Sequence, residues 1–96
     1  MRKYEVMYIL RADLDEAARE ATKQELADLL VANGATVGKV DESFGLRELA
    51  YPINEELKGY YVVVKMTADQ AALDEFSRKV RHNAKVLRFF IVADQE

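Results

Sequence analysis

The sequence predicts a small α+β domain, and three features of its 96 residues support this fold class. Two segments place apolar residues at helical spacing, whereas four others alternate in polarity or are rich in β-branched and aromatic residues. Polar or glycine-containing turns separate these segments. The composition, 50% hydrophobic and 32% charged, is typical of a globular chain with one hydrophobic core. We therefore expect one domain over residues 1–96.

The first two predicted elements are a strand and a helix. From Tyr4 to Leu10, side chains alternate with a period of two, which predicts a strand with one face more buried than the other. Asp13 and Glu16 have the spacing of a capping box, and leucines and alanines follow at approximately helical spacing. Asn33-Gly34 supplies a left-handed stop, so the helix should run from about Asp15 to Asn33.

A long, interrupted second strand should follow. Thr36 to Val40 and Leu46 to Ala50 are extended patterns, and Ser43-Phe44-Gly45 between them indicates a bend or bulge. Pro52 has no amide proton and should end regular pairing. Residues 54–59 are then expected to form a polar turn.

A third strand, a second helix and a fourth strand complete the chain. Tyr60 to Met66 is rich in β-branched and aromatic residues, which favours a strand. Thr67 to Gln70 repeats the capping-box spacing before a helix that should end near His82-Asn83. The apolar stripe of this helix consists of Leu73, Phe76 and Val80. Val86 to Val92 is a final apolar strand.

The order β-α-β-β-α-β in so short a chain indicates a ferredoxin-like split βαβ sandwich. Right-handed crossovers then place both helices on one face of a four-stranded antiparallel sheet and leave the other face open to a partner. Residues expected on the open face are Tyr61, Val63, Lys65, Arg88 and Phe90. Residues expected in the core are Val6, Leu30, Val62, Leu73, Phe76 and Ile91.

The residues that enzymes and metal sites need are missing, so we expect no catalytic residue, metal, cofactor or small-molecule substrate. There is no cysteine, and the one histidine, His82, follows a basic helix without a nearby carboxylate. Ser43 and Ser77 have no local base, and the loop Leu10 to Asp13 lacks the glycines that wrap a phosphate. The apolar run Val6 to Leu10 is too short for a signal core or a membrane span, which favours a cytoplasmic protein.

Charge is distributed unevenly along the chain. The formal net charge is -3, which disfavours nucleic-acid binding by bulk charge alone. However, Phe76 to Ala93 contains no acidic residue, whereas Asp13 to Asp28 holds six acids against Arg19 and Lys23. The cations of the basic stretch are Arg78, Lys79, Arg81, Lys85 and Arg88. A basic surface can therefore coexist with an acidic chain.

Two resemblances point to RNA. Residues 58–63, Lys-Gly-Tyr-Tyr-Val-Val, partly resemble the central-strand signature of RNA-recognition motifs, although Tyr60 in the core and Tyr61 in cross-strand packing is the favoured interpretation. More specifically, residues 45–53 (GLRELAYPI) and 58–61, with residues 1–6 and 86–88, resemble the bacterial small-subunit ribosomal protein six family. This second resemblance covers essentially the whole chain. Glu48 and the acidic pair Glu55-Glu56 depart from the family pattern.

The family resemblance implies a structural protein of the cytoplasmic ribosome. Such a protein binds the central domain of small-subunit ribosomal RNA together with ribosomal protein eighteen, and it catalyses nothing. The residues that we expect to contact RNA are Arg2, Lys3, Tyr4, Arg47, Tyr51, Arg81, Lys85 and Arg88. The residues that we expect to meet the partner protein are Leu46, Leu49, Tyr61, Val63 and Phe90. Tyr4 and Tyr51 can pack as easily as they can stack on bases.

Two other functions remain open from the sequence. One is an RNA-recognition-motif-like module that binds single-stranded RNA without a partner by stacking bases on strands one and three, with Tyr61 essential. The other is a protein-interaction domain whose open sheet pairs with another chain and which has no affinity for RNA.

Overall fold

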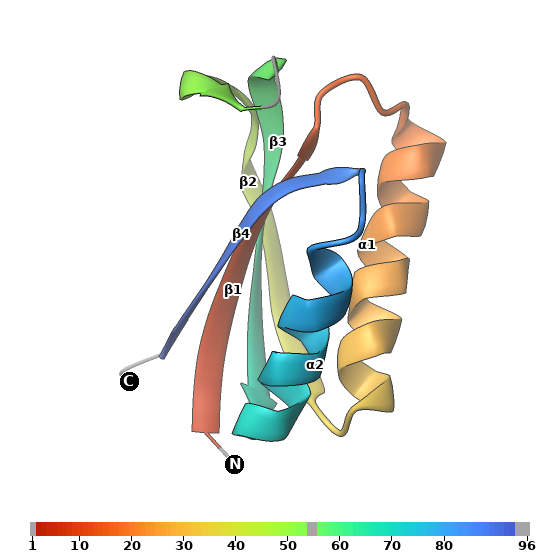
Figure 1. Cartoon of the computed structure of the whole chain (residues 1–96), viewed down its shortest axis with the longest axis vertical. Helices are drawn as coiled ribbons and strands as arrows, with labels where there is room; N and C mark the ends of the chain where they lie inside the picture. Colours follow the sequence, from red (N-terminus) through yellow and green to blue (C-terminus); the bar gives the residue numbers. More distant parts are fainter. Residues whose placement is uncertain (1, 54–55, 94–96) are drawn as a thin grey trace.

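The computed structural model describes residues 2–53 and 56–93 and contains the six elements in the expected order. They are β1 (Arg2–Arg11), α1 (Glu16–Ala32), β2 (Thr36–Ile53), β3 (Glu56–Ala68), α2 (Gln70–Val80) and β4 (Val86–Ala93). The strands form an antiparallel sheet in the order β2-β3-β1-β4, and both helices cover the same face of it (Figure 1). The ferredoxin-like fold predicted from the sequence is therefore confirmed.

The core lies between the helices and the two central strands. Val6 of β1 faces Val64 of β3, and both side chains are buried under the helices. Five of the six expected core residues are buried, namely Val6, Leu30, Val62, Leu73 and Phe76. The sixth, Ile91, is partly buried and packs against this cluster from β4. Alternation along the strands thus identifies the inner face correctly.

Both helices begin two residues later than the predicted capping boxes would place them. The carboxylate of Asp15 accepts a hydrogen bond from the amide of Ala18 at 2.7 Å, and Asp69 accepts one from Ala72 at 2.9 Å. Each aspartate satisfies an amide that the first helical turn leaves without a partner. Asp13, the predicted cap, instead forms an ion pair with Arg11 at 2.9 Å. The assignments of the Asp13-Glu16 and Thr67-Gln70 boxes were therefore wrong.

The hairpin between β2 and β3 is more extended than the sequence suggests. Regular pairing ends at Glu48, ahead of Pro52, and Ile53 pairs again with Glu56. The expected polar turn over residues 54–59 is wrong for its last four residues, because residues 56–59 already belong to β3. Residues 54 and 55 lie outside the described residues. The register shifts that accompany the predicted bulge lie between Asp41 and Gly45.

Gly59 allows three strands to approach one another at the base of this hairpin. A Cβ atom on Gly59 would overlap the Cγ2 methyl of Ile9 and would lie 3.3 Å from Cδ2 of Leu49. Gly59 and Ile9 are both buried, and the branched side chain of Ile9 cannot rotate its methyl group away cheaply.

Substituting Gly59 by alanine should therefore destabilise the protein. We expect the free energy of unfolding to fall by about 1–3 kcal/mol, the usual cost of overpacking. Urea denaturation followed by circular dichroism measures this directly. Gly34→Ala is the comparison for backbone strain without overpacking, because φ is +90° there and no neighbouring atom would meet the new Cβ. An unchanged midpoint for Gly59→Ala would contradict the packing described.

Candidate nucleic-acid interface

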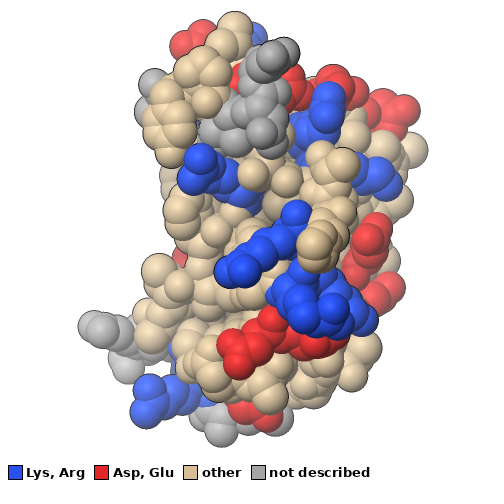
Figure 2. Space-filling view, viewed as in Figure 1, with Lys and Arg blue, Asp and Glu red and all other residues tan. Residues whose placement is uncertain are grey.

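A basic groove runs along the β4 edge, beside the end of α2. Its volume is about 340 Å³, and its lining consists of Val80, Arg81, Val86, Leu87, Arg88, Phe89 and Phe90. Figure 2 shows basic side chains gathered across the middle of this face and acidic side chains along its α1 side. Arg81 and Arg88 are both exposed. The groove combines guanidinium groups with aromatic rings, which suits phosphates and bases.

Tyr51 reaches Arg88, one of the groove residues, from the opposite edge of the sheet. The guanidinium carbon of Arg88 lies 5.7 Å from the centroid of the Tyr51 ring. Tyr51 belongs to β2 and Arg88 to β4, which are the two outer strands. Sheet twist must therefore carry the end of the β2–β3 hairpin over the open face. Tyr51 and Arg88, which are expected independently from the sequence to contact RNA, are thereby brought together. Tyr51 is 57% exposed.

Arg47 lies on the same hairpin and is held in one orientation. Its guanidinium carbon lies 5.1 Å from the Phe44 ring centroid, and its Nε donates a hydrogen bond to the Phe44 carbonyl at 3.0 Å. Arg47 pairs with Gly59, so the register places it on the open face with Tyr61. Its remaining donors are available to a phosphate, because the side chain is exposed.

Lys85 completes this end of the molecule from the loop between α2 and β4. Its carbonyl accepts a hydrogen bond from the Arg11 amide at 3.0 Å, and its amide donates to the side chain of Asn83 at 3.0 Å. These backbone contacts fix the loop, while the Lys85 side chain is exposed. The residues that the fold gathers at this end are Arg47, Tyr51, Arg81, Lys85 and Arg88.

The other three predicted RNA residues lie elsewhere. Arg2 and Lys3 begin β1 and are exposed, but they stand roughly 30 Å along the strand from Arg11 and the basic groove. Tyr4 faces the helices and packs, partly buried, against the core. We therefore interpret Tyr4 as a packing residue and treat Arg2 and Lys3 as a separate basic end.

The register of the sheet places three of the predicted partner-protein residues on the open face. Tyr61 pairs with Ile9, while Val63 and Phe90 both pair with Met7, so these side chains share the open face. Phe90 is 48% exposed, which gives the face an accessible apolar edge.

Leu46 and Leu49 occupy different surroundings from the rest of that face. Leu46 pairs with Tyr60, which packs against the core, so Leu46 lies on the helix side of the sheet. Leu49 is half-buried and lies beside Gly59 on the open side. Glu48, which departs from the family pattern, stands opposite Lys58. The open face therefore includes Leu49 but not Leu46.

Two features of this region are not among those expected from the sequence. Met7 and Ile9 contribute to the open face, and the alternation along β1 would have identified them, because they lie between the buried Val6, Tyr8 and Leu10. The polar contacts that join α1 to Glu42 and Tyr60 carry no local sequence signal, because their partners are 18 or more residues apart. Such contacts emerge only from the folded arrangement.

Other kinds of site receive no support from the described residues. Over residues 2–53 and 56–93, no group of three or more histidine, aspartate or glutamate side chains could hold a metal ion. Within the same ranges, neither helix is long and apolar enough to cross a membrane.

Comparison with known proteins identifies the family of the chain. The family model described as ribosomal protein S6 matches residues 3–93. Small ribosomal subunit protein bS6 of Halalkalibacterium halodurans is 43% identical over 96 residues, and that of Exiguobacterium sibiricum is 41% identical, with full coverage of both chains in each case. The crystal structure of 30S ribosomal protein S6 from Thermotoga maritima covers 97% of this chain, and this chain covers 87% of that one. Its TM-score of 0.90 at 24% identity shows the same fold. This chain therefore belongs to the ribosomal protein S6 family and is a structural protein of the small ribosomal subunit, not an enzyme.

Proposed function

We propose that this protein binds the central domain of small-subunit ribosomal RNA together with ribosomal protein eighteen, through the one domain that the sequence predicts over residues 1–96. The observation that carries the proposal is the groove at the β4 edge. Arg81 and Arg88 line it, and both belong to a stretch of chain, Phe76 to Ala93, without an acidic residue. Arg88 also lies against the Tyr51 ring of β2. Guanidinium forks bind phosphates, and the aromatic ring offers a stacking surface to a base.

The open face of the sheet is the surface that we assign to ribosomal protein eighteen. Its accessible apolar part consists of Met7, Tyr61 and Phe90, whereas Val63 and Ile9 on the same face are buried. A partner that covers this face would stand beside the basic groove, so that one RNA could contact both proteins. Joint docking makes the second binding step effectively intramolecular and raises the overall affinity.

The acidic balance of the chain explains why it needs a partner. With a net charge of -3 and few cations in the groove, the protein can neutralise only a few phosphates. The salt dependence of RNA binding grows with the number of neutralised phosphates, about 0.9 per phosphate on a duplex. We expect weak binding by the isolated protein and strong, salt-sensitive binding when the partner supplies further cations.

A filter-binding titration on a central-domain ribosomal RNA fragment tests this proposal. It is run with and without ribosomal protein eighteen, at low and at higher salt. Strong binding only in the presence of the partner, weakened by salt, is the expected result. Tight binding to unstructured RNA without the partner would instead support the single-strand module. The absence of any salt-dependent RNA affinity would support a protein-interaction domain.

Replacing Arg88 by lysine should weaken RNA binding although the charge is kept. A guanidinium group binds phosphate with two parallel hydrogen bonds and stacks on the Tyr51 ring, and an ammonium group does neither as well. We expect roughly a three- to tenfold loss of affinity for the fragment in the joint assay, equivalent to one good hydrogen bond. Lys85→Arg, which keeps the charge of an exposed loop cation, is the comparison. Unchanged affinity of a folded Arg88→Lys protein would contradict the role assigned to Arg88.

A further inference from the structure

The β2–β3 hairpin forms an arm beyond Glu42 and Tyr60, which we define as residues 43–53 and 56–59. Figure 1 shows it projecting from one end of the sheet, away from the helices. The arm carries Arg47 and Tyr51, two of the proposed RNA contacts. Its exposed large side chains indicate that the core does not anchor it; they include Phe44, Leu46, Tyr51 and Leu57.

The backbone pairing is irregular where the arm begins. Asp41 pairs with Val63, and the next pair is Gly45 with Tyr61. Glu42, Ser43 and Phe44 therefore stand opposite Val62 alone. Such a bulge bends a strand and interrupts its ladder, so pairing by itself fixes the direction of the arm poorly. Besides the contacts of Tyr51 with Arg88 and of Glu56 with Arg11, a side-chain contact at the base of the arm helps to set it.

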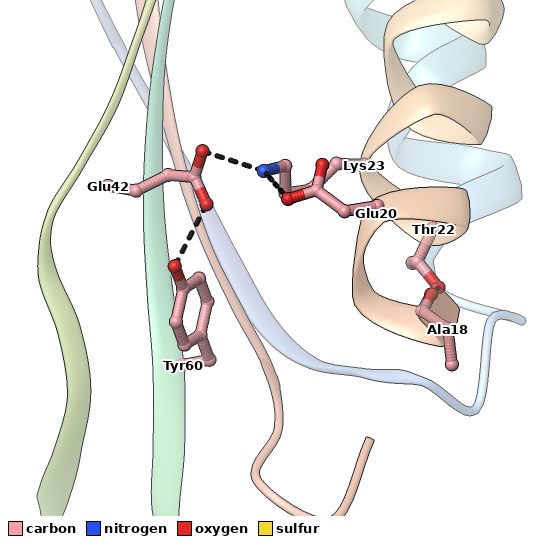
Figure 3. A network of polar contacts seen from close by, with 6 residues as sticks. All are labelled: Ala18, Glu20, Thr22, Lys23, Glu42 and Tyr60. Atoms are coloured by element: carbon pink, nitrogen blue, oxygen red, sulfur yellow. Dashed lines mark hydrogen bonds and ion pairs between the residues drawn. The ribbon is translucent and has the colours of Figure 1, made fainter. Parts of the chain in front are cut away.

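Side chains of α1 supply that contact at the bulge (Figure 3). One carboxylate oxygen of Glu42 lies 2.6 Å from Nζ of Lys23, and the other accepts a hydrogen bond from the Tyr60 hydroxyl at 2.9 Å. Lys23 also pairs with Glu20 at 2.9 Å, and the guanidinium of Arg19 lies 4.3 Å from the Tyr60 ring centroid. Both strands at the base of the arm are thereby tied to one helix.

The tie is shielded and fully charged at neutral pH. The Lys23 side chain is only 12% exposed, and that of Glu42 is 33% exposed. The hydrogen bond from Lys23 holds the pKa of Glu42 below its usual range. Burial acts to lower the pKa of Lys23, but its hydrogen bonds to Glu42 and Glu20 outweigh burial and raise it. Breaking the pair at Glu42 leaves Lys23 with Glu20 alone, and breaking it at Lys23 leaves the Glu42 carboxylate without its ion-pair partner. Losing one member of a partly buried ion pair is costly.

The tie connects directly to a proposed RNA contact. Phe44, two residues after Glu42 in the same bulge, holds Arg47 through its carbonyl and its ring. We propose that Lys23 and Glu42 are positioning residues for RNA binding, because their ion pair at the arm's base sets where Arg47 and Tyr51 stand. The inference rests on the proposed function, since it assigns these residues a role in that binding without contact to RNA.

The direction in which one substitution changes RNA affinity distinguishes this role from a bulk electrostatic effect. Glu42→Ala removes a negative charge, which by itself should favour RNA. Loss of the tie should instead lower affinity for the central-domain fragment, in the presence of the partner, by about three- to tenfold, the net value of one ordinary hydrogen bond. Glu20→Ala is the matched control. It removes the same charge from the same Lys23 but leaves the contacts between Lys23, Glu42 and Tyr60 in place. Equal or higher affinity of Glu42→Ala would overturn the proposal.

Amide hydrogen exchange shows whether the arm itself has loosened. In Glu42→Ala, amides of the arm should exchange about tenfold faster, while those of the central strands β1 and β3 keep their protection. Lys23→Met breaks the tie from the helix side and should reproduce the effect, which keeps the test valid if Glu42→Ala folds poorly. Unchanged exchange of the arm in both variants would overturn the proposal.

A double-mutant cycle with Arg47→Gln separates failure of this inference from failure of the proposed function. If the tie acts through the arm, Glu42→Ala should cost less affinity once Arg47 is gone than when Arg47 is present, because only Tyr51 is then left to be misplaced. A loss with Arg47→Gln and none with Glu42→Ala would overturn the positioning role and leave the proposed function standing. If Arg47→Gln itself had no effect, the proposed RNA contact of the arm would be wrong, and the positioning role with it.

Discussion

Replacing Phe76 by alanine should lower the free energy of unfolding by about 3–5 kcal/mol, the usual cost of deleting a large aromatic side chain from a core. Phe76 is completely buried, and its ring meets the Phe89 ring edge-to-face with centroids 6.1 Å apart. It therefore joins α2 to β4. A cavity at this point would leave β4 less firmly packed and would disturb the adjacent groove.

Urea denaturation measures this loss, with the slope of the transition showing whether the native state stays compact. Val31→Ala is the control, because Val31 is an apolar residue of α1 that is 58% exposed. Its removal should change stability by less than about 0.5 kcal/mol. A loss below about 1 kcal/mol for Phe76→Ala would show that the contact between α2 and β4 is not part of the core.

Removing both arginines of the groove should produce the largest loss of RNA binding. For Arg81→Gln with Arg88→Gln, we expect affinity for the central-domain fragment to fall about 10- to 100-fold in the presence of the partner, since charge-assisted hydrogen bonds are each worth about 1.5–3 kcal/mol and such effects add incompletely. The dependence on salt should also weaken, by a slope of about one for each phosphate contact removed.

Two other cations of α2 provide a matched control for this pair. Arg78 and Lys79 both form ion pairs with Glu75 and do not line the groove, although Arg78 lies beside Arg81 in a neighbouring hollow. Arg78→Gln with Lys79→Gln removes the same formal charge and should weaken binding much less. Equal losses for the two double variants would mean that net charge, and not the groove, determines affinity.

The fold could be predicted because its determinants are local patterns. Alternation along residues 4–10 and the apolar stripes of the two helices each identify a buried face, and the order of elements then permits few topologies. The helix caps were misplaced because the sequence offers two aspartates close together, Asp13 and Asp15, and the capping-box spacing favoured the wrong one. In the structure Arg11 engages Asp13, which leaves Asp15 to cap α1.

The candidate interface could be predicted only in part. The basic character of residues 76–93 is visible in the sequence, but the meeting of Tyr51 with Arg88 depends on sheet twist and on the length of the hairpin. Likewise, the side of the sheet on which Leu46 stands depends on the bulge at residues 42–44, because each extra residue shifts the alternation. The face of the sheet on which a side chain lies therefore cannot be predicted from the sequence where it depends on the register between distant strands.

The most direct test of the proposed RNA interface is to determine which face of the protein lies next to ribosomal RNA. Because the chain has no cysteine, a single cysteine can carry an iron chelate that cleaves nearby RNA by hydroxyl radicals. The chelate is placed at Lys85→Cys, beside the basic groove, or at Asp28→Cys, on the exposed acidic side of α1. In the assembled small subunit, we predict cleavage of the central domain from position 85 and little from position 28. Cleavage from position 28 alone would contradict the assignment of the β4 edge to RNA.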